Sequence, residues 1–183
     1  PDAEDTMIGP VVSEKQWNNI QGYIRSGIEE GAILVTGGLD RPNGLPTGYF
    51  VQPTVFANVT PDMTIAREEI FGPVLSTVRV PNYEAAVQLV QDNPYGNGIA
   101  IFTRDGDTAR DFVSKIEVGM VGVNVPIPVP VAFHSFGGWK KSLFGDHDIY
   151  GPESINFYTR LKAVTSRWPT GIKEGAKFNF PTL

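Results

Sequence analysis

Apolar side chains recur at helical spacing near the start of the chain. They are Trp17, Ile20, Ile24 and Ile28. Residues with this repeat lie on one face of a helix. Ser13 comes just before the run and Gln16 follows three positions later, which is the pattern of a capping box. The sequence therefore predicts a helix over 14–30, with Gly31 as its C-terminal stop.

Short apolar runs rich in β-branched residues predict strands along much of the chain. The predicted strands are 32–36, 49–51, 54–59, 74–80, 99–102 and 120–125. Pro53 stands directly before one of them. Because proline has no backbone donor, we expect the strand 54–59 at a sheet edge.

Two further helices are predicted among the later strands, over 82–92 with Asn82 as cap and over 107–116 with Asp107 as cap. Pro94 ends the first, since the residue before a proline disfavours the helical region. The alternation of strands and helices with short loops predicts parallel strands in an α/β fold. No repeat and no linker divides the chain.

The pattern changes after Asn124. Three prolines alternate with Ile127 and Val129, which excludes this segment from a sheet interior. A short helix over 153–157 is expected, and 158–168 alternates like a strand. This strand has no obvious partner within the chain. An unpaired apolar edge favours assembly into a dimer or larger oligomer.

Composition narrows the class of protein. The 183 residues are 41% hydrophobic, which is ordinary for a globular domain, and 20 Gly with 15 Pro predict many turns. No apolar run is long enough for a spanning helix, and the acidic residues 1–5 are not those of a signal peptide. The net charge of −5 argues against binding a phosphate backbone.

The chain contains no cysteine, which excludes disulfides, zinc thiolate sites and a thiol nucleophile within it. His134 and Ser135 are neighbours, so they do not have the arrangement of a catalytic triad. The run 146–148 offers three metal ligands, although a solvated loop is the favoured interpretation. The run 67–73 has two interpretations. Composition favours a charged surface turn. The alternative is a site in which a carboxylate of this run binds the hydroxyls of a ribose beside an aromatic wall.

Several motifs together resemble the NAD(P)-dependent aldehyde dehydrogenases. Residues 68–74 read E-E-I-F-G-P-V, and 48–55 read G-Y-F-V-Q-P-T-V. The motifs at 94–96, 136–140 and 158–159 continue the family pattern in order, and the similarity extends to about Trp168. The resemblance implies a three-layer α/β fold with a mostly parallel sheet. It divides the chain into a partial catalytic domain over 1–157, an oligomerisation strand over 158–168 and a tail over 169–183.

A narrower resemblance covers the C-terminal half. The runs 121–130, 145–146, 157–160 and 164–168 are similar to the methylmalonate and malonate semialdehyde dehydrogenases, which acylate CoA. Residues 142–147 depart from the S-G-x-G-R-E of typical relatives, as expected in this narrower group. The first half, 8–73, resembles aldehyde dehydrogenases in general.

The resemblance implies roles for particular residues. Glu69 would bind the nicotinamide ribose hydroxyls and Phe71 would pack against the nicotinamide ring. The residues expected along the aldehyde entrance are Ile127, Pro128, Val129, His134 and Phe136. In the family, a thiolate attacks the aldehyde, hydride passes to NAD or NADP, and water or CoA releases the acyl group. That cysteine lies before the region matched here, so we expect this chain to be a C-terminal portion that is inactive alone.

The sequence leaves two alternatives open. A dehydrogenase of the same class could release its acyl group to water instead of CoA. The chain could also be a non-catalytic oligomerisation module built around the strand 158–168. The family resemblance further leads us to expect an aldehyde substrate, a homodimer or homotetramer, no nucleic-acid or membrane partner, no bound metal and a cytoplasmic location.

Overall fold

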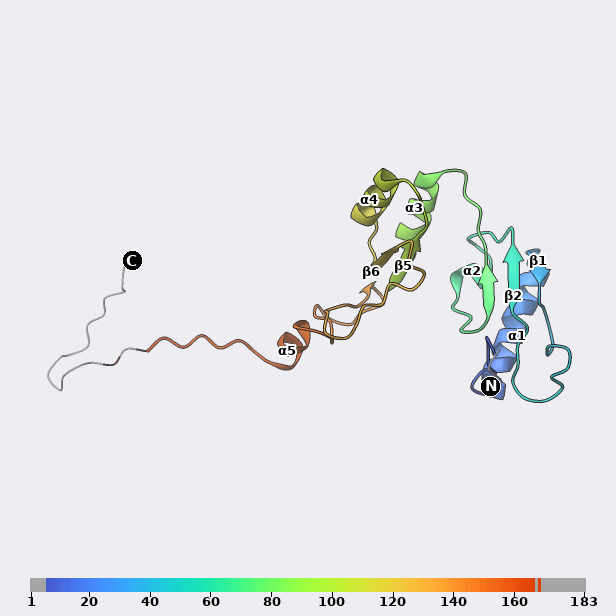
Figure 1. Ribbon diagram of the computed structural model, residues 1–183, viewed down its shortest axis with the longest axis horizontal. Coiled ribbons are helices and arrows are strands. Elements are labelled where there is room, and N and C mark those ends of the chain that lie inside the picture. The colour runs from blue at the N-terminus through green and yellow to red at the C-terminus, as the bar shows by residue number, and fades with distance from the viewer. Residues whose placement is uncertain (1–5, 167, 169–183) are drawn as a thin grey trace. The chain divides into compact units, whose positions relative to one another are not determined.

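The computed structural model describes residues 6–166 and Trp168 (Figure 1). The chain forms two compact units, Pro1–Asn93 and Pro94–Leu183. The boundary coincides with the end of a predicted helix and carries no linker composition, which is why the sequence did not indicate it. Among the described residues, no helix combines the length and the apolar character needed to cross a membrane.

The first unit is built around one long helix, α1 (Glu14–Glu29), as predicted. The Ser13 hydroxyl accepts a hydrogen bond from the Gln16 backbone N–H at 3.2 Å, so the predicted cap is formed. Two shorter helices follow, α2 (Thr64–Arg67) and α3 (Tyr83–Gln91). The Asn82 side chain caps α3, which confirms the second predicted helix start.

Three strands form the sheet of this unit, β1 (Ile33–Thr36), β2 (Thr54–Ala57) and β3 (Val74–Ser76). Their order is β1-β2-β3, with β1 antiparallel and β3 parallel to β2. The expectation that 54–59 is an edge strand was wrong, because β2 is central. Pro53 precedes the ladder and breaks no bond in it, and the Thr54 N–H donates to the Pro73 carbonyl. The predicted strand 49–51 is not formed.

The core of the first unit lies between α1 and β2. A Cβ built on Gly27 of α1 would lie 3.1 Å from the Phe56 ring, so helix and strand are in close contact there. The buried apolar residues are Ile20, Ile24, Ala32, Val51, Phe56, Val59, Ile65 and Ile70. Ile70 joins the loop after α2 to this core.

The second unit contains the predicted strand–helix–strand segment. Strands β5 (Gly98–Ile101) and β6 (Met120–Val123) are parallel and are connected through α4 (Gly106–Lys115). The cap of α4 was predicted at Asp107 but is Asp105, whose carboxylate accepts from the Thr108 N–H at 2.7 Å. The helix begins at Gly106, so Asp107 already lies within its first turn.

A second small sheet pairs β4 (Tyr95–Gly96) with β7 (Trp139–Lys140) in antiparallel fashion. The described residues thus form three small sheets, with two parallel and two antiparallel pairings. One mostly parallel sheet in three layers is not confirmed. Strand β3, the first of the strands expected to be parallel, pairs with β2 in parallel fashion.

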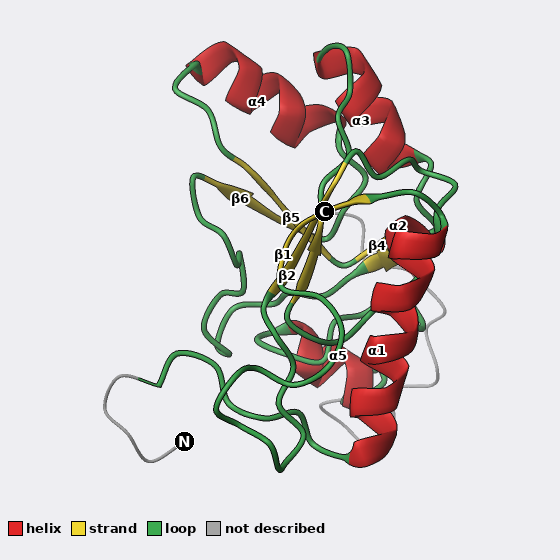
Figure 2. Ribbon diagram, turned by 90° about the vertical axis from the view of Figure 1, so that its right-hand side faces the viewer, coloured by secondary structure: helices red, strands yellow, loops and turns green. Residues whose placement is uncertain are grey.

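The last helix is α5 (Glu153–Tyr158), labelled in Figure 2. It extends one residue beyond the predicted 153–157 and takes the first residue of the predicted strand 158–168. Residues 159–166 form no ladder with any described residue. Pairing of this segment with a neighbouring subunit stays a prediction. Arg167 and the predicted tail 169–183 lie outside the described residues.

Candidate functional site

The loop that follows α2 presents one aromatic ring to solvent. Ile70 is buried in the core, whereas the next residue, Phe71, leaves 76% of its surface exposed. The backbone of Phe71 has a φ of +52°. A residue with a side chain pays about 1 kcal/mol or more in this left-handed region, so its neighbours must hold it there.

Three contacts hold this loop in place. The Gln16 side-chain amide donates to the carbonyls of Ile70 at 3.2 Å and Phe71 at 3.0 Å. Gly72 lies against Ile20, where a Cβ would come within 2.5 Å of the isoleucine Cδ1. Both anchoring residues belong to α1. The exposed ring of Phe71 is therefore presented by a loop that is attached to the longest helix.

The two glutamates before Ile70 have different surroundings. The Glu68 carboxylate accepts a hydrogen bond from the Tyr23 hydroxyl at 2.9 Å. This bond to a carboxylate raises the pKa of Tyr23 above its ordinary value. Glu69 is exposed, and its carboxylate has no hydrogen-bond or ion-pair partner within 6–166 or at Trp168. Glu68 thus has a structural bond, whereas Glu69 is available to a ligand beside Phe71.

The segment after β6 begins at a strained asparagine. Asn124 has a φ of +57°, and its side-chain amide exchanges two 3.0 Å hydrogen bonds with the backbone of Thr103. These bonds tie the chain just after β6 to the chain just after β5. They fix the direction in which the proline-rich segment leaves the sheet.

The five predicted substrate residues lie along this segment of the second unit. Ile127 and Val129 are exposed, as the prolines between them predict, and Pro128 packs against Gly122. His134 is exposed beside the Phe133 ring. The Phe136 ring stacks on Tyr150, with centroids 4.7 Å apart and planes within 3°.

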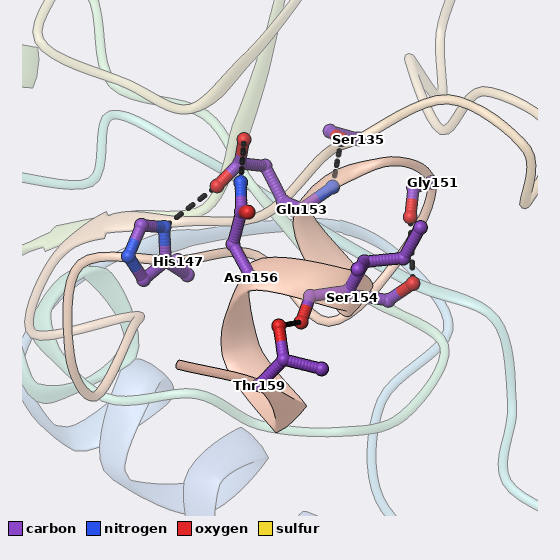
Figure 3. A network of polar contacts seen from close by, with 8 residues as sticks. Ser135, His147, Gly151, Glu153, Ser154, Asn156 and Thr159 are labelled. Atoms are coloured by element: carbon purple, nitrogen blue, oxygen red, sulfur yellow. Dashed lines mark hydrogen bonds and ion pairs between the residues drawn. The ribbon is translucent and has the colours of Figure 1, made fainter. Parts of the chain in front are cut away.

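A polar network near α5 was not predicted from the sequence (Figure 3). Nδ1 of His147 lies 2.6 Å from Oε2 of Glu153, and the Asn156 amide donates to Oε1 of the same carboxylate. The Ser135 hydroxyl accepts from the Glu153 backbone N–H. The network joins the loop around His147 to the first turn of the helix. Its partners are too far apart in sequence to form a recognisable motif.

The network includes the histidine of the run 146–148. His147 faces Glu153, not its acidic neighbours. In the part of the chain that the structure describes, no three His, Cys, Asp or Glu side chains are grouped so as to hold a metal ion. The structure thus gives His147 a carboxylate partner, and the solvated-loop interpretation of 146–148 stays a prediction.

The first unit also contains an apolar cavity of about 440 Å³. Its wall consists of the segment 7–9, the loop residues Pro42 and Leu45, and the residues Phe50, Val51 and Pro53. None of the predicted site residues lines it. The cavity and the exposed ring of Phe71 are separate features of the unit.

Comparison with known proteins supplies the context for these features. The profile of the Aldehyde dehydrogenase family matches residues 1–164. A malonate-semialdehyde dehydrogenase of Pseudomonas aeruginosa is 55% identical over 178 residues, which cover 96% of this chain and 36% of the relative. The chain spans about a third of the length of the malonate-semialdehyde dehydrogenases that it matches.

Two solved structures with semialdehyde dehydrogenase names are also similar. One, from Sinorhizobium meliloti 1021, is described as a methylmalonate-semialdehyde dehydrogenase complexed with NAD. It has a TM-score of 0.87 and 56% identity over 93% of this chain and 35% of that one. The methylmalonate-semialdehyde dehydrogenase of Oceanimonas doudoroffii has a TM-score of 0.82 and 50% identity, over 89% of this chain and 34% of its own.

Proposed function

Because the chain belongs to the aldehyde dehydrogenase family, we propose that it forms the part of a semialdehyde dehydrogenase that contacts the nicotinamide end of NAD and one wall of the aldehyde entrance. The names of the similar proteins support malonate or methylmalonate semialdehyde as the substrate. The NAD complex of the Sinorhizobium meliloti protein supports this cofactor over NADP.

The loop after α2 fits this role. The unpaired Glu69 carboxylate has two oxygens that accept hydrogen bonds from neighbouring ribose hydroxyls. The exposed Phe71 ring offers an apolar face to a flat heteroaromatic ring. NAD, when bound, supplies the acceptor for the hydride of the aldehyde. The exposure of Phe71 at a positive φ, beside a free carboxylate, is the observation that carries the proposal.

The aldehyde entrance is assigned to the segment after β6. Ile127, Pro128, Val129 and Phe136 provide apolar surface, and His134 is the titratable residue among the five. An apolar wall with few polar groups is usual for small-molecule sites. The stacking of Tyr150 on Phe136 gives that ring a fixed orientation.

The chemistry also needs a nucleophile that this chain lacks, since it has no cysteine. We propose that the 183 residues alone produce no NADH, and that a thiolate outside them forms the acyl thioester. CoA would then accept the acyl group. Release to water is the alternative, and assay of the longer protein with and without CoA distinguishes the two.

The cofactor role is tested in the longer protein that contains this segment. Glu69→Gln should raise the KM for NAD by about tenfold or more, since hydrogen bonds to a charged group contribute about 1.5–3 kcal/mol. Glu68→Gln is the matched control, because the neighbouring carboxylate binds Tyr23 instead. Equal effects of the two variants on the KM for NAD would count against the assignment.

Oligomerisation is a second proposed role, supported by exposed apolar residues in 158–168. Leu161 and Trp168 are almost fully exposed, and 159–166 pair with no described strand. We propose that this segment adds to the sheet of a neighbouring subunit. Leu161→Asp should then shift light-scattering mass toward the monomer, whereas Lys162→Asp, on the other face of a strand, should not. A parent protein that is already monomeric would refute this role.

A further inference from the structure

The connection between β1 and β2 contains an exposed turn at its tip. The Leu45 N–H donates to the Pro42 carbonyl at 3.1 Å, which makes Asn43 and Gly44 the central residues of a four-residue turn. The base of the loop is closed by Arg41. Its Nε donates to the Gly48 carbonyl at 2.7 Å, and its guanidinium lies 4.7 Å from the centre of the Trp17 ring.

Asn43 and Gly44 are both exposed. In the described part of the chain, neither the Asn43 side chain nor the Gly44 N–H has a hydrogen-bond partner. Gly44 has a φ of +83°, and no heavy atom lies within 4 Å of the position a Cβ would occupy. The asparagine amide and the following backbone nitrogen are therefore unobstructed, and neither group has a native hydrogen bond that must break before they approach each other.

We propose that Asn43–Gly44 is a site of spontaneous deamidation and isomerisation. The Gly44 backbone nitrogen attacks Cγ of Asn43, a C–N bond forms, and the side-chain amide leaves as ammonia with the proton lost from the attacking nitrogen. The product is a five-membered succinimide. Water then adds to either of its carbonyl carbons and breaks one C–N bond, which gives aspartate or isoaspartate. No oxidant or reductant takes part.

The chain contains a second Asn–Gly pair that serves as an internal comparison. Asn97 directly precedes β5, and Gly98 is the first residue of that strand, in register with Met120. The Met120 N–H donates to the Asn97 carbonyl at 3.1 Å. Rotation of this backbone toward the geometry of attack would break the ladder with β6. The same two residue types are thus free to react in the turn and restrained in the strand.

The modification would alter the loop in two ways. A carboxylate would appear two residues from Arg41, whose guanidinium closes the loop. The isoaspartate form also lengthens the backbone between Pro42 and Leu45, which are both part of the cavity wall. Conversion at this site therefore changes charge and chain length beside an apolar cavity of the first unit.

The test uses the purified protein that contains this segment, aged in warm, mildly alkaline buffer. Trypsin places the two pairs in different peptides, 26–67 and 80–104, because Arg41 precedes a proline. We expect peptide 26–67 to gain one mass unit, to separate into two isomers and to carry heavy oxygen when aged in labelled water. Peptide 80–104 should remain unchanged.

Matched variants locate the reaction. Asn43→Gln should abolish the mass gain of peptide 26–67, because the longer side chain cannot close a five-membered ring, whereas Asn97→Gln should leave it unchanged. In urea, both peptides should convert at similar rates. Equal conversion of the two peptides in the folded chain, or conversion that persists in Asn43→Gln, would overturn the proposal.

Discussion

Replacement of Gly72 by alanine tests how the exposed Phe71 ring is held. A Cβ at this position would lie 2.5 Å from Cδ1 and 2.9 Å from Cγ1 of Ile20. Ile20 is completely buried in the core of the first unit, so its side chain cannot turn toward solvent. The added methyl group must therefore displace either the core residue or the loop that carries Phe71.

The expected size follows from two opposing terms. Overpacking of a filled core costs about 1–3 kcal/mol. The loss of glycine's freedom in the unfolded chain returns about 0.4–1 kcal/mol. We therefore expect Gly72→Ala to lower the free energy of unfolding by about 1–2 kcal/mol. The loop is also attached just after Gly72, because the Pro73 carbonyl accepts the Thr54 N–H at the start of β2. The strain should therefore fall on the loop, which is held on both sides of Gly72.

Urea unfolding followed by circular dichroism measures the change, with the midpoint expected to fall at constant slope. Gly22→Ala is the matched control, because Gly22 lies on the exposed side of α1 with open space around it. That variant should gain about 0.5–1 kcal/mol. Ile20→Val removes Cδ1, the atom nearest to the added methyl group. The double variant with Gly72→Ala should therefore lose less stability than the sum of the losses of the two single variants. Equal midpoints for Gly72→Ala and the parent would refute the packing argument.

Three further outcomes are expected. Ser13→Ala removes the cap of α1 and should lower the free energy of unfolding in urea by about 1 kcal/mol. Ser13→Asn keeps a capping side chain and should retain most of the parent's stability. The Thr108 N–H holds the pKa of Asp105 below its ordinary 3.8. The resulting stabilisation is complete above that value and is lost as the pH falls through the lowered pKa of the folded state. Asp105→Asn keeps a cap but does not titrate, so acid titration should destabilise it less than the parent. Gly119→Ala should prevent the close approach of Gly119 to the Gly137 carbonyl, which thermal unfolding should detect as a lowered midpoint.

Features encoded by neighbouring residues were predictable from the sequence. The start of α1 at Glu14 and the cap at Asn82 follow from residues three positions apart, and both are confirmed. The cap of α4 was misplaced by two residues, because Asp105 and Asp107 are chemically equivalent candidates. The choice between them depends on which side chain reaches the Thr108 N–H, and that is a matter of backbone geometry.

Strand pairing was less predictable, because partners come from distant parts of the chain. The parallel pair β5 and β6 was expected, since α4 provides the crossover between them. The position of β2 in the centre of its sheet was not, because Pro53 suggested an edge. The short helix α2 and the two-residue strands β4 and β7 have too few residues to show a period.

The candidate site was partly accessible from sequence motifs. The family resemblance indicated Glu69 and Phe71, but the pattern E-E alone does not show which carboxylate is free. That distinction arises from Tyr23, which is far away in the sequence and bonds Glu68. The pairing of His147 with Glu153 was likewise hidden, because the carboxylate lies six positions after the histidine and no local pattern links the two residues.

The contacts that shape the loop after α2 are all internal to the first unit. Gln16 bonds two of its carbonyls, Gly72 lies against Ile20, and Ile70 is inserted in the core. None of these groups needs a ligand in order to form its contact. Under the proposed function, a nucleotide bound against Phe71 would meet a loop whose conformation is already fixed by folding. The free-energy cost of ordering the loop would then be part of folding and not of binding. Such preorganisation favours affinity without additional contacts to the ligand.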